Sequence, residues 1–458
     1  MRYFSSLNFS ALSLIFLIVL GIKCTHAEIN LKQIKTDIEI LASDEMQGRE
    51  VFTPAIDKAA DYIAQRFEQI GLTYLSGLLS FKQSFSIYQV SPKSISIKIN
   101  GEKIANENVA SLTFHKNRSW NKPSEFNIKF ILEEDNFRKM IGEINQSDKD
   151  TLVLIDPSHK EIFARYQSFF SRPKNQFEIN SGPSLVLVIK PAIEITTVKI
   201  NLKTTAIKKS LTNVVGILKS GMVKELSNKS VIFSAHYDHL GIKDNDTSNV
   251  DNKNIVKTKE DDLIFNGADD DASGTTAVIA LAEHYATKSN RKRDLIFVAF
   301  TAEEIGGFGS QYFSQQINAE NIVAMINVEM IGKPSKFGAG EFWMTGFERS
   351  DLAQIINTQL EKIGSKMYQD PYPKQQLFYR SDNATLARLG VPAHSFSTDE
   401  IDKDPHYHKA SDEVKTLDMK SMVEVIKKLS IATEPLVIGT AAPTRLDTKK
   451  VRKKGSFF

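Results

Sequence analysis

The N-terminal part of the chain has apolar positions at helical spacing. Within residues 31–43 apolar side chains recur every three or four positions, as at Ile34 and Ile38, and this is the period of one helix face. Residues 55–72 repeat the pattern, and Gly71 supplies a typical C-terminal stop. Two amphipathic helices are therefore predicted here.

Residues 81–205 follow a different pattern, in which short β-rich runs are separated by polar turns. Such runs predict short strands. They lie at 85–90, 94–99, 126–132, 151–157, 184–190 and 198–203. Residues 159–170 are compatible with one helix. We therefore expect an inserted β-rich domain, and no group of side chains in it suggests chemistry.

The pattern changes again beyond residue 206, where longer apolar strands alternate with helical stretches. The predicted strands lie at 214–219, 230–238, 294–302, 322–330, 341–346 and 391–398, and the predicted helices at 275–288, 351–364, 383–390 and 422–434. This alternation predicts an α/β domain with a mostly parallel central sheet flanked by helices.

The expected domain order follows from these patterns. Residues 28–80 and 206–440 form the two parts of the α/β domain, and the β-rich segment 81–205 is inserted between them. Residues 241–263 are long and polar, which indicates a surface loop. Residues 441–458 form a basic tail, for which a solvated segment is the simplest interpretation.

The N-terminus is typical of a cleaved secretory signal. A basic start precedes a short apolar run from Ala11 to Ile22, and small residues follow. The run is too short for a membrane-spanning helix, and cleavage after Ala27 fits the pattern. We therefore expect residues 1–27 to be removed and the protein to be secreted or periplasmic. Lipid anchoring at Cys24 is a weaker alternative, because Lys23 replaces the expected small residue.

Composition narrows the possible functions. The chain has 458 residues, of which 41% are hydrophobic and 25% charged, and this is typical of a globular protein. The net charge of +3 gives no overall field for nucleic acid. Cys24 is the only cysteine, so the mature chain would have neither disulfides nor cysteine ligands for a metal. No stable membrane insertion is expected after signal cleavage.

Acids and histidines follow the predicted strands of the α/β domain. Because ligands bind at the carboxyl ends of strands in such sheets, we expect these side chains to meet at one edge. They are His236 and Asp238, then the triplet Asp269, Asp270 and Asp271, then Glu303 and Glu304, then Glu329, and finally His406 and His408.

Each of these groups has an ordinary explanation when taken alone. A single aspartate can cap a helix, and a pair of glutamates is usually solvated. Capping needs one aspartate rather than three, however, and crowded buried carboxylates need a cation or lose their charge. Histidine and carboxylate ligands without cysteine favour catalytic zinc.

Five ligands with one bridging carboxylate would make two zinc sites. Such a pair of metals would activate a bridging water, and a base must then take the proton from that water. Glu303 and Glu304 point in different directions because they are neighbours in sequence. One of them is therefore expected to be the base and the other a metal ligand.

Several motifs together resemble the di-zinc metallopeptidases of family 28, which include bacterial leucyl aminopeptidase, Streptomyces-type aminopeptidase and glutamate carboxypeptidase. They are "HYD", "GADDDASG", "AFTAEEIGGFGS", "INVEMIG", "RSDNATLARLGVPAHSF" and "YHKASDE". The resemblance covers about residues 30–80 and 210–437, so it implies that the α/β domain is a zinc peptidase. The insert occupies the place of a protease-associated domain but matches none by motif.

The resemblance also implies residue roles. His236 would bind one zinc and Asp238 would orient it, while Asp270 would bridge both metals. Asp269 and Asp271 would then support the loop and cap the following helix.

The remaining motifs complete the implied site. Glu303 matches the general base and Glu304 a ligand of the second zinc. His408 matches the final ligand better than His406, which is expected to be a bystander, as is His239. Glu329 stands where the family usually has aspartate, so the longer side chain puts the geometry at that ligand in doubt.

Tyr379 and Arg380 are candidates for binding the carbonyl or carboxylate of a substrate. The expected function is that of a secreted, zinc-dependent exopeptidase with two zinc ions, acting on peptides or proteins and most simply an aminopeptidase. A carboxypeptidase, or a glutaminyl cyclase-like enzyme using one zinc, is the alternative on the same fold. A receptor-like relative without catalysis is a further alternative.

Overall fold

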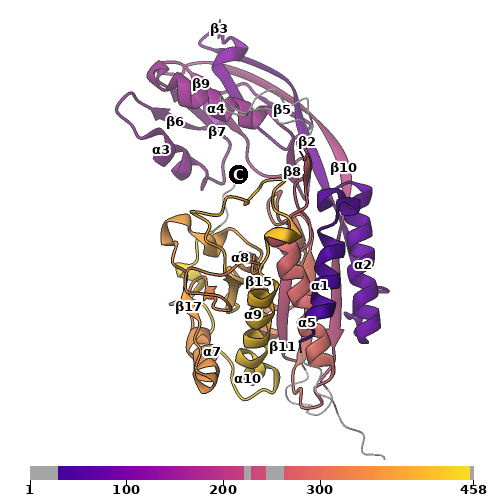
Figure 1. The fold of residues 1–458 in the computed structure, drawn as a ribbon. Coiled ribbons are helices and arrows are strands. Elements are labelled where there is room, and N and C mark those ends of the chain that lie inside the picture. The colour runs from indigo at the N-terminus through magenta and orange to yellow at the C-terminus, as the bar shows by residue number, and fades with distance from the viewer. Residues whose placement is uncertain (1–28, 221–227, 244–261, 454–458) are drawn as a thin grey trace, which may run out of the picture.

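The computed structural model describes residues 29–220, 228–243 and 262–453. Figure 1 shows a larger α/β body, from which two long strands lead to a smaller body. The predicted signal segment with Cys24, and most of the polar loop at 241–263, lie outside the described residues. Within the described part of the chain, no helix is both long and apolar enough to cross a membrane.

A 12-stranded mixed sheet forms the core of the larger body. Its centre is parallel, and the strands run in the order β18 (Ala393–Ser397), β15 (Ile322–Val328), β11 (Ser230–His236) and β14 (Asp294–Phe300). Antiparallel strands follow on both sides, with β16 (Trp343–Met344) beyond β18 and β10 (Val198–Leu218) beyond β14. The sheet is therefore parallel where the sequence predicts it and mixed as a whole.

Helices cover both faces of this sheet, so its central strands are buried along almost their whole length. One face carries α1 (Leu31–Leu41), α2 (Pro54–Ile70), α5 (Gly274–Ala286) and α9 (Met419–Ala432). The other face packs against α6 (Phe308–Gln316) and α8 (Asn383–Ala387). Gly71 ends α2 with a positive φ of 88°, as the sequence predicts.

The smaller body is built on a four-stranded sheet in the order β4 (Val109–Leu112), β9 (Leu185–Ile189), β7 (Thr151–Ile155) and β6 (Asn127–Ile131). Its last three strands are parallel. The helices α3 (Phe137–Ile144) and α4 (Lys160–Ser171) contribute buried side chains to its core. The segment 81–205 is thus an α/β unit as well as a β-rich one.

Two long antiparallel strands connect the bodies (Figure 1). The strands predicted at 85–90 and 94–99 form one continuous strand, β2 (Lys82–Ile99), which pairs along its length with β10. The last residues of β10, Val214–Leu218, pair with β14 in the central sheet.

The remaining helices and strands are shorter or lie at the periphery. They are β1 (Thr73–Tyr74), β3 (Glu102–Lys103), β5 (Asn117–Trp120), β8 (Lys174–Gln176), β12 (Gly241–Ile242), β13 (Ile264–Phe265), α7 (Leu352–Leu360), β17 (Tyr368–Gln369) and α10 (Glu434–Val437).

Candidate metal centre

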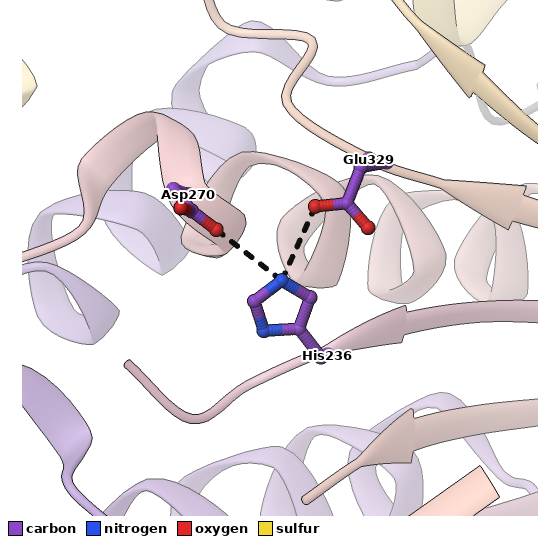
Figure 2. A group of neighbouring side chains, drawn as sticks. All are labelled: His236, Asp270 and Glu329. Carbon is purple, nitrogen blue, oxygen red and sulfur yellow. Dashed lines mark hydrogen bonds and ion pairs between the residues drawn. The ribbon is translucent and has the colours of Figure 1, made fainter. Parts of the chain in front are cut away.

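Three side chains from separate elements meet where the central strands end. His236 is the last residue of β11, Asp270 lies in the turn before α5, and Glu329 directly follows β15. The Nε2 atom of His236 lies 3.3 Å from Asp270 Oδ1 and 3.2 Å from Glu329 Oε1 (Figure 2). This is the first of two ligand groups.

A second group forms on the opposite side of Asp270. His408 Nε2 lies 3.2 Å from Asp270 Oδ2 and 3.4 Å from Glu304 Oε2. The two oxygens of Asp270 therefore face different histidines. A carboxylate in this position can bridge two metal ions.

The distances in both groups fit zinc. With bonds of about 2.0–2.1 Å in tetrahedral geometry, neighbouring ligand atoms lie roughly 3.3–3.4 Å apart. The four nitrogen–oxygen distances of 3.2–3.4 Å match this edge. Histidine and carboxylate donors suit zinc, so the residues present fit two zinc ions.

His239 also belongs to this centre, although the sequence favoured a bystander. Its Nδ1 lies 2.8 Å from Glu304 Oε1 and 3.9 Å from Asp270 Oδ2. The shorter distance is that of a hydrogen bond to a carboxylate rather than a tetrahedral edge. His239 therefore donates to Oε1 of Glu304, and Oε2 remains directed toward His408. The only signal for this residue in the sequence is its place directly after "HYD".

Asp238 orients the centre in two ways. Its carbonyl oxygen lies 3.1 Å from Nδ1 of His236, whereas its carboxylate is 3.8 Å from the same atom. The carboxylate instead accepts from the backbone N–H groups of Glu303 and Glu304, at 3.1 and 3.3 Å. The carbonyl therefore orients His236, as metal-binding histidines require, and the carboxylate fixes the turn that carries both glutamates.

The outer aspartates of the triplet hold the backbone around Asp270. Asp271 accepts from the N–H of Gly274 at the start of α5 and from the N–H of Met330, both at 3.0 Å. Asp269 accepts from the N–H of Gly332 at 2.7 Å. The peptide bond between Asp270 and Asp271 is cis.

The side chain of Glu329 is held by Ser381, which was not predicted as a site residue from the sequence. Ser381 Oγ donates to Glu329 Oε2 at 2.5 Å. Oε1 is left directed at His236 (Figure 2). This hydrogen bond holds the glutamate side chain in place.

Glu303 lies beside the metal ligands but contacts none of the histidines in either group at ion-pair distance. Burial raises the pKa of Glu303 well above its usual range, although His236 acts in the opposite direction. A carboxylate with a raised pKa suits proton transfer near neutral pH.

A cleft of about 550 Å³ opens beside these residues. Apart from Glu303 and the metal ligands, its walls are formed by Met330, Trp343, Thr345, Leu377, Arg380, Ser381, Ser395, Ser397, Asp399, Ile401 and Tyr407.

The structure separates the two candidates for substrate binding. Arg380 lines the cleft and donates to the hydroxyl of Tyr407 at 3.3 Å. The ring of Tyr407 stacks on His408 with centroids 3.9 Å apart. Tyr379 is placed elsewhere, because its hydroxyl accepts from the backbone N–H of Arg452 at 3.1 Å.

His406 is placed away from both ligand groups. Its Nδ1 lies 3.0 Å from the hydroxyl of Ser411.

Comparison with known proteins gives matches over the same region. Residues 213–432 match Peptidase family M28. A probable leucine aminopeptidase of Arthroderma benhamiae is 29% identical over 170 residues, which is 35% of this chain and 45% of that protein. Leucine aminopeptidase 1 of Fusarium vanettenii is 26% identical over 208 residues, or 43% of this chain and 49% of that protein. The chain thus matches about half the length of these relatives.

Solved structures share the fold over almost the whole chain. An aminopeptidase from Aneurinibacillus sp. has a TM-score of 0.53 at 17% identity and covers 94% of this chain and 98% of its own. A zinc aminopeptidase from Bacillus subtilis has a TM-score of 0.52 with the same identity and coverage. The predicted α/β fold and the family resemblance are confirmed. Residues 213–432 of this chain therefore form a domain of peptidase family M28.

Proposed function

We propose that the protein is a zinc-dependent exopeptidase that removes residues from the N-termini of peptides. The main support for this proposal is the position of Asp270. Its two oxygens face two different histidines, His236 and His408, at distances compatible with zinc. The matches to aminopeptidases support the same class of activity. The proposal assigns two zinc ions to each chain.

Bound zinc would polarise the scissile carbonyl and make the attacking water more acidic. Glu303 then takes a proton from that water and later delivers it to the leaving amine. It is suited to this role because it lines the cleft next to the ligands without being one of them. Arg380 and Tyr407 also line the cleft, and in this proposal they donate to the carbonyl oxygen of the substrate.

The charges around the cleft favour attack at the amino end. A free α-amine carries a proton with a pKa near 8, and the carboxylates of the cleft can hold that cation. A substrate carboxylate would instead need a cluster of basic side chains. Among the described residues that line the cleft, Arg380 is the only lysine or arginine, and it also donates to Gln375 at 3.2 Å.

Matched peptides with blocked termini test this direction of attack. N-acetylation should abolish cleavage, whereas C-terminal amidation should leave the rate unchanged, with products identified by mass spectrometry. Cleavage of acetylated peptides with amidated ones spared would establish a carboxypeptidase. Formation of pyroglutamate from N-terminal glutamine without peptide cleavage would establish a cyclase.

We also propose that the mature protein is secreted or periplasmic after cleavage behind Ala27. The support is the basic start, the short apolar run and the small residues in the sequence. N-terminal sequencing of protein recovered outside the cytoplasm should begin at Glu28. If the mature chain instead starts at a lipid-modified Cys24, the protein is anchored to a membrane and the proposal is wrong.

A further inference from the structure

Lys333 lies within a cluster of aspartates behind the metal ligands. Its Nζ is 2.8 Å from Asp404 Oδ2, 3.2 Å from Asp269 Oδ2 and 3.8 Å from Asp412 Oδ1. The three carboxylates are buried, and the lysine side chain is 16% exposed. Asp399 is also buried, with an oxygen within 4.8 Å of Asp269 and Asp404. The ammonium group is therefore the cation of this cluster.

These aspartates belong to the two segments that carry ligands of the second metal. Asp269 directly precedes the bridging Asp270. Asp404 and Asp412 lie four residues before and after His408. Asp412 also accepts from the backbone N–H groups of Asp269 and Asp270, at distances of 3.0–3.1 Å. Lys333 thus links the turn at 269–270 to the loop that contains His408.

The positive charge of Lys333 balances the carboxylates of the two segments. Buried carboxylates repel one another unless a cation balances them, and removing one partner of a buried ion pair leaves an uncompensated charge. Without the ammonium group, Asp269 and Asp404 would face each other across the boundary between the two segments. Protonation of one carboxylate can relieve part of this repulsion. The rest is relieved when the segments move apart, which would also separate Asp270 from His408.

We propose that Lys333 is a positioning residue that holds Asp270 and His408 at the separation needed by the second metal. The inference rests on the proposed two-zinc centre. It concerns the site shared by Asp270, Glu304 and His408. The effect is expected there first, because His408 belongs to that site alone, whereas Asp270 also faces His236. Lys333 acts through the aspartates, because its ion pairs within the described chain are with Asp269, Asp404 and Asp412, none of which is a proposed ligand.

Zinc retention in Lys333→Met tests the proposal directly. Methionine keeps the length of the side chain but removes its charge. Loss of an outer partner commonly weakens metal binding about 10–100-fold, and we expect a loss of this size for one zinc only. Zinc content would be measured by atomic emission after dialysis against a series of chelator concentrations. Lys336→Met makes the same chemical change at an exposed position three residues away and should retain zinc like the unchanged protein.

A second variant separates positioning from folding. Asp404→Asn removes the other half of the closest ion pair without touching a ligand. If repulsion between the unbalanced carboxylates is responsible, adding Asp404→Asn to Lys333→Met should restore part of the lost zinc affinity, because it removes one of the two facing charges. Losses that multiply in the double variant would show two independent effects and overturn the inference.

The outcomes also distinguish this inference from the proposed function. In one outcome the unsubstituted protein binds two zinc ions and Lys333→Met retains both equally well. This result would overturn only the inference about Lys333. An unchanged protein that binds only one zinc overturns the two-metal centre, and the role of Lys333 in it falls as well.

Discussion

Asp270 contacts His236 through one oxygen and His408 through the other, so one side chain joins two ligand groups. Its neighbours in the triplet are not spare ligands. Asp271 holds the start of α5, and Asp269 holds the backbone at Gly332. The three adjacent carboxylates therefore have different partners, which explains how they can be buried side by side.

Changing Glu303 to glutamine tests the proposed division of labour between the adjacent glutamates. The amide has the same shape but cannot accept a proton from water, so the turnover rate should fall about 10²–10⁴-fold. Zinc content should not change, because Glu303 is not among the proposed ligands. Glu304→Gln is the matched control and should lose the second zinc. The reverse pattern of zinc loss would exchange the two roles.

His239→Asn tests the hydrogen bond to Glu304. Losing it frees the carboxylate to turn, and zinc affinity at the second site should decrease about 10–100-fold. Equilibrium competition with a zinc-sensitive dye measures this affinity. His406→Asn makes the same change at a histidine outside both groups and should have no effect. Equal affinities in the two variants would contradict the assignment.

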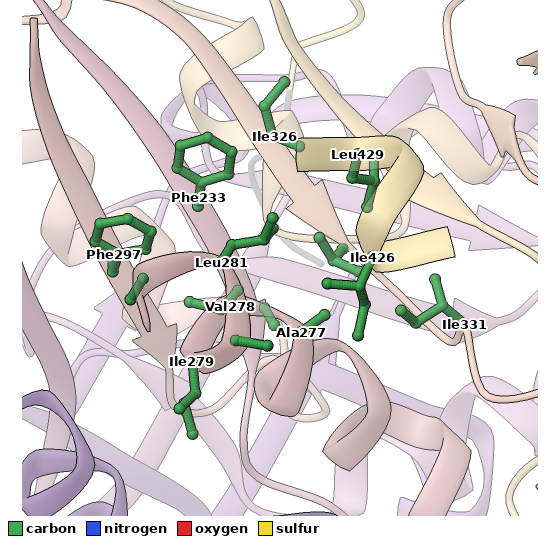
Figure 3. Packing of buried hydrophobic residues seen from close by; sticks show 14 of the residues in the cluster. Phe233, Ala277, Val278, Ile279, Leu281, Phe297, Ile326, Ile331, Ile426 and Leu429 are labelled. Atoms are coloured by element: carbon green, nitrogen blue, oxygen red, sulfur yellow. The ribbon is translucent and has the colours of Figure 1, made fainter. Parts of the chain in front are cut away.

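Among the elements, α5 is the one that places Asp270 and also packs most deeply. Figure 3 shows its residues Ala277, Val278 and Leu281 between Phe233 of β11 and Ile426 of α9. Residues 274–282 of this helix are all buried because sheet and helices enclose them, whereas Glu283 and His284 in its last turn are partly exposed. The buried core therefore extends directly up to the turn that carries Asp270.

Leu281→Ala measures what this packing contributes. Leu281 is fully buried, and leucine-to-alanine changes in cores cost about 2–5 kcal/mol of unfolding free energy. Urea-induced unfolding followed by circular dichroism gives the value. Leu79→Ala is the control, since Leu79 is 97% exposed and should change the free energy by less than about 0.5 kcal/mol. Similar values for both variants would mean that the core around α5 is loosely packed.

His394 on β18 makes the stability of this sheet sensitive to acid. Burial lowers the pKa of His394 to about 4 in the folded state, whereas an unfolded histidine has a pKa near 6.5. The unfolded chain therefore binds a proton first as the pH falls. The contribution of neutral His394 is complete above pH 6.5 and is lost progressively between pH 6.5 and 4, by about 3 kcal/mol.

Comparing unfolding free energies of the unchanged protein and His394→Gln across this pH range isolates the effect. The difference between the two should shrink as the pH falls, because glutamine does not titrate. Parallel pH profiles would show that His394 is not held neutral.

The sequence correctly predicted strands at 85–90 and 94–99, but it did not predict that they form the single strand β2. Pro92 has no N–H to donate, and it interrupts the run between the two predicted strands. In the structure the pairing with β10 skips one residue here, since Thr204 faces Pro92 while Lys203 faces Ser94. Such a bulge accommodates proline within a long strand, and its presence depends on a partner more than one hundred residues away.

Across the whole molecule, the sequence predicted the fold class and a ligand set that the structure brings together in two groups. Strand ends in a parallel sheet meet at one edge, so residues such as His236 and Glu329 could be placed from local pattern alone. His239, Ser381 and Lys333 were missed as contributors because their roles depend on which oxygen of a distant carboxylate they contact. No periodicity or motif encodes such a choice.

The chain enters the smaller body along β2 and returns from it along β10. No described residue of the segment 92–204 lines the cleft. Replacing this segment with a two-residue Asn-Gly turn should therefore leave a protein that binds two zinc ions and cleaves short peptides at an unchanged rate. Gel filtration, zinc analysis and a peptide assay check this. A soluble, folded deletion that lacks zinc would show that the smaller body supports the centre.

The register of these strands makes that deletion geometrically simple. Ser91 lies directly opposite Thr205, so the two cut ends are already neighbours, and a tight turn of this type can close a hairpin between them. The same adjacency means that a foreign domain with neighbouring termini could be grafted at this point without altering the path of the chain in the larger body. The strand pair is thus a position at which the smaller body could be exchanged for another domain.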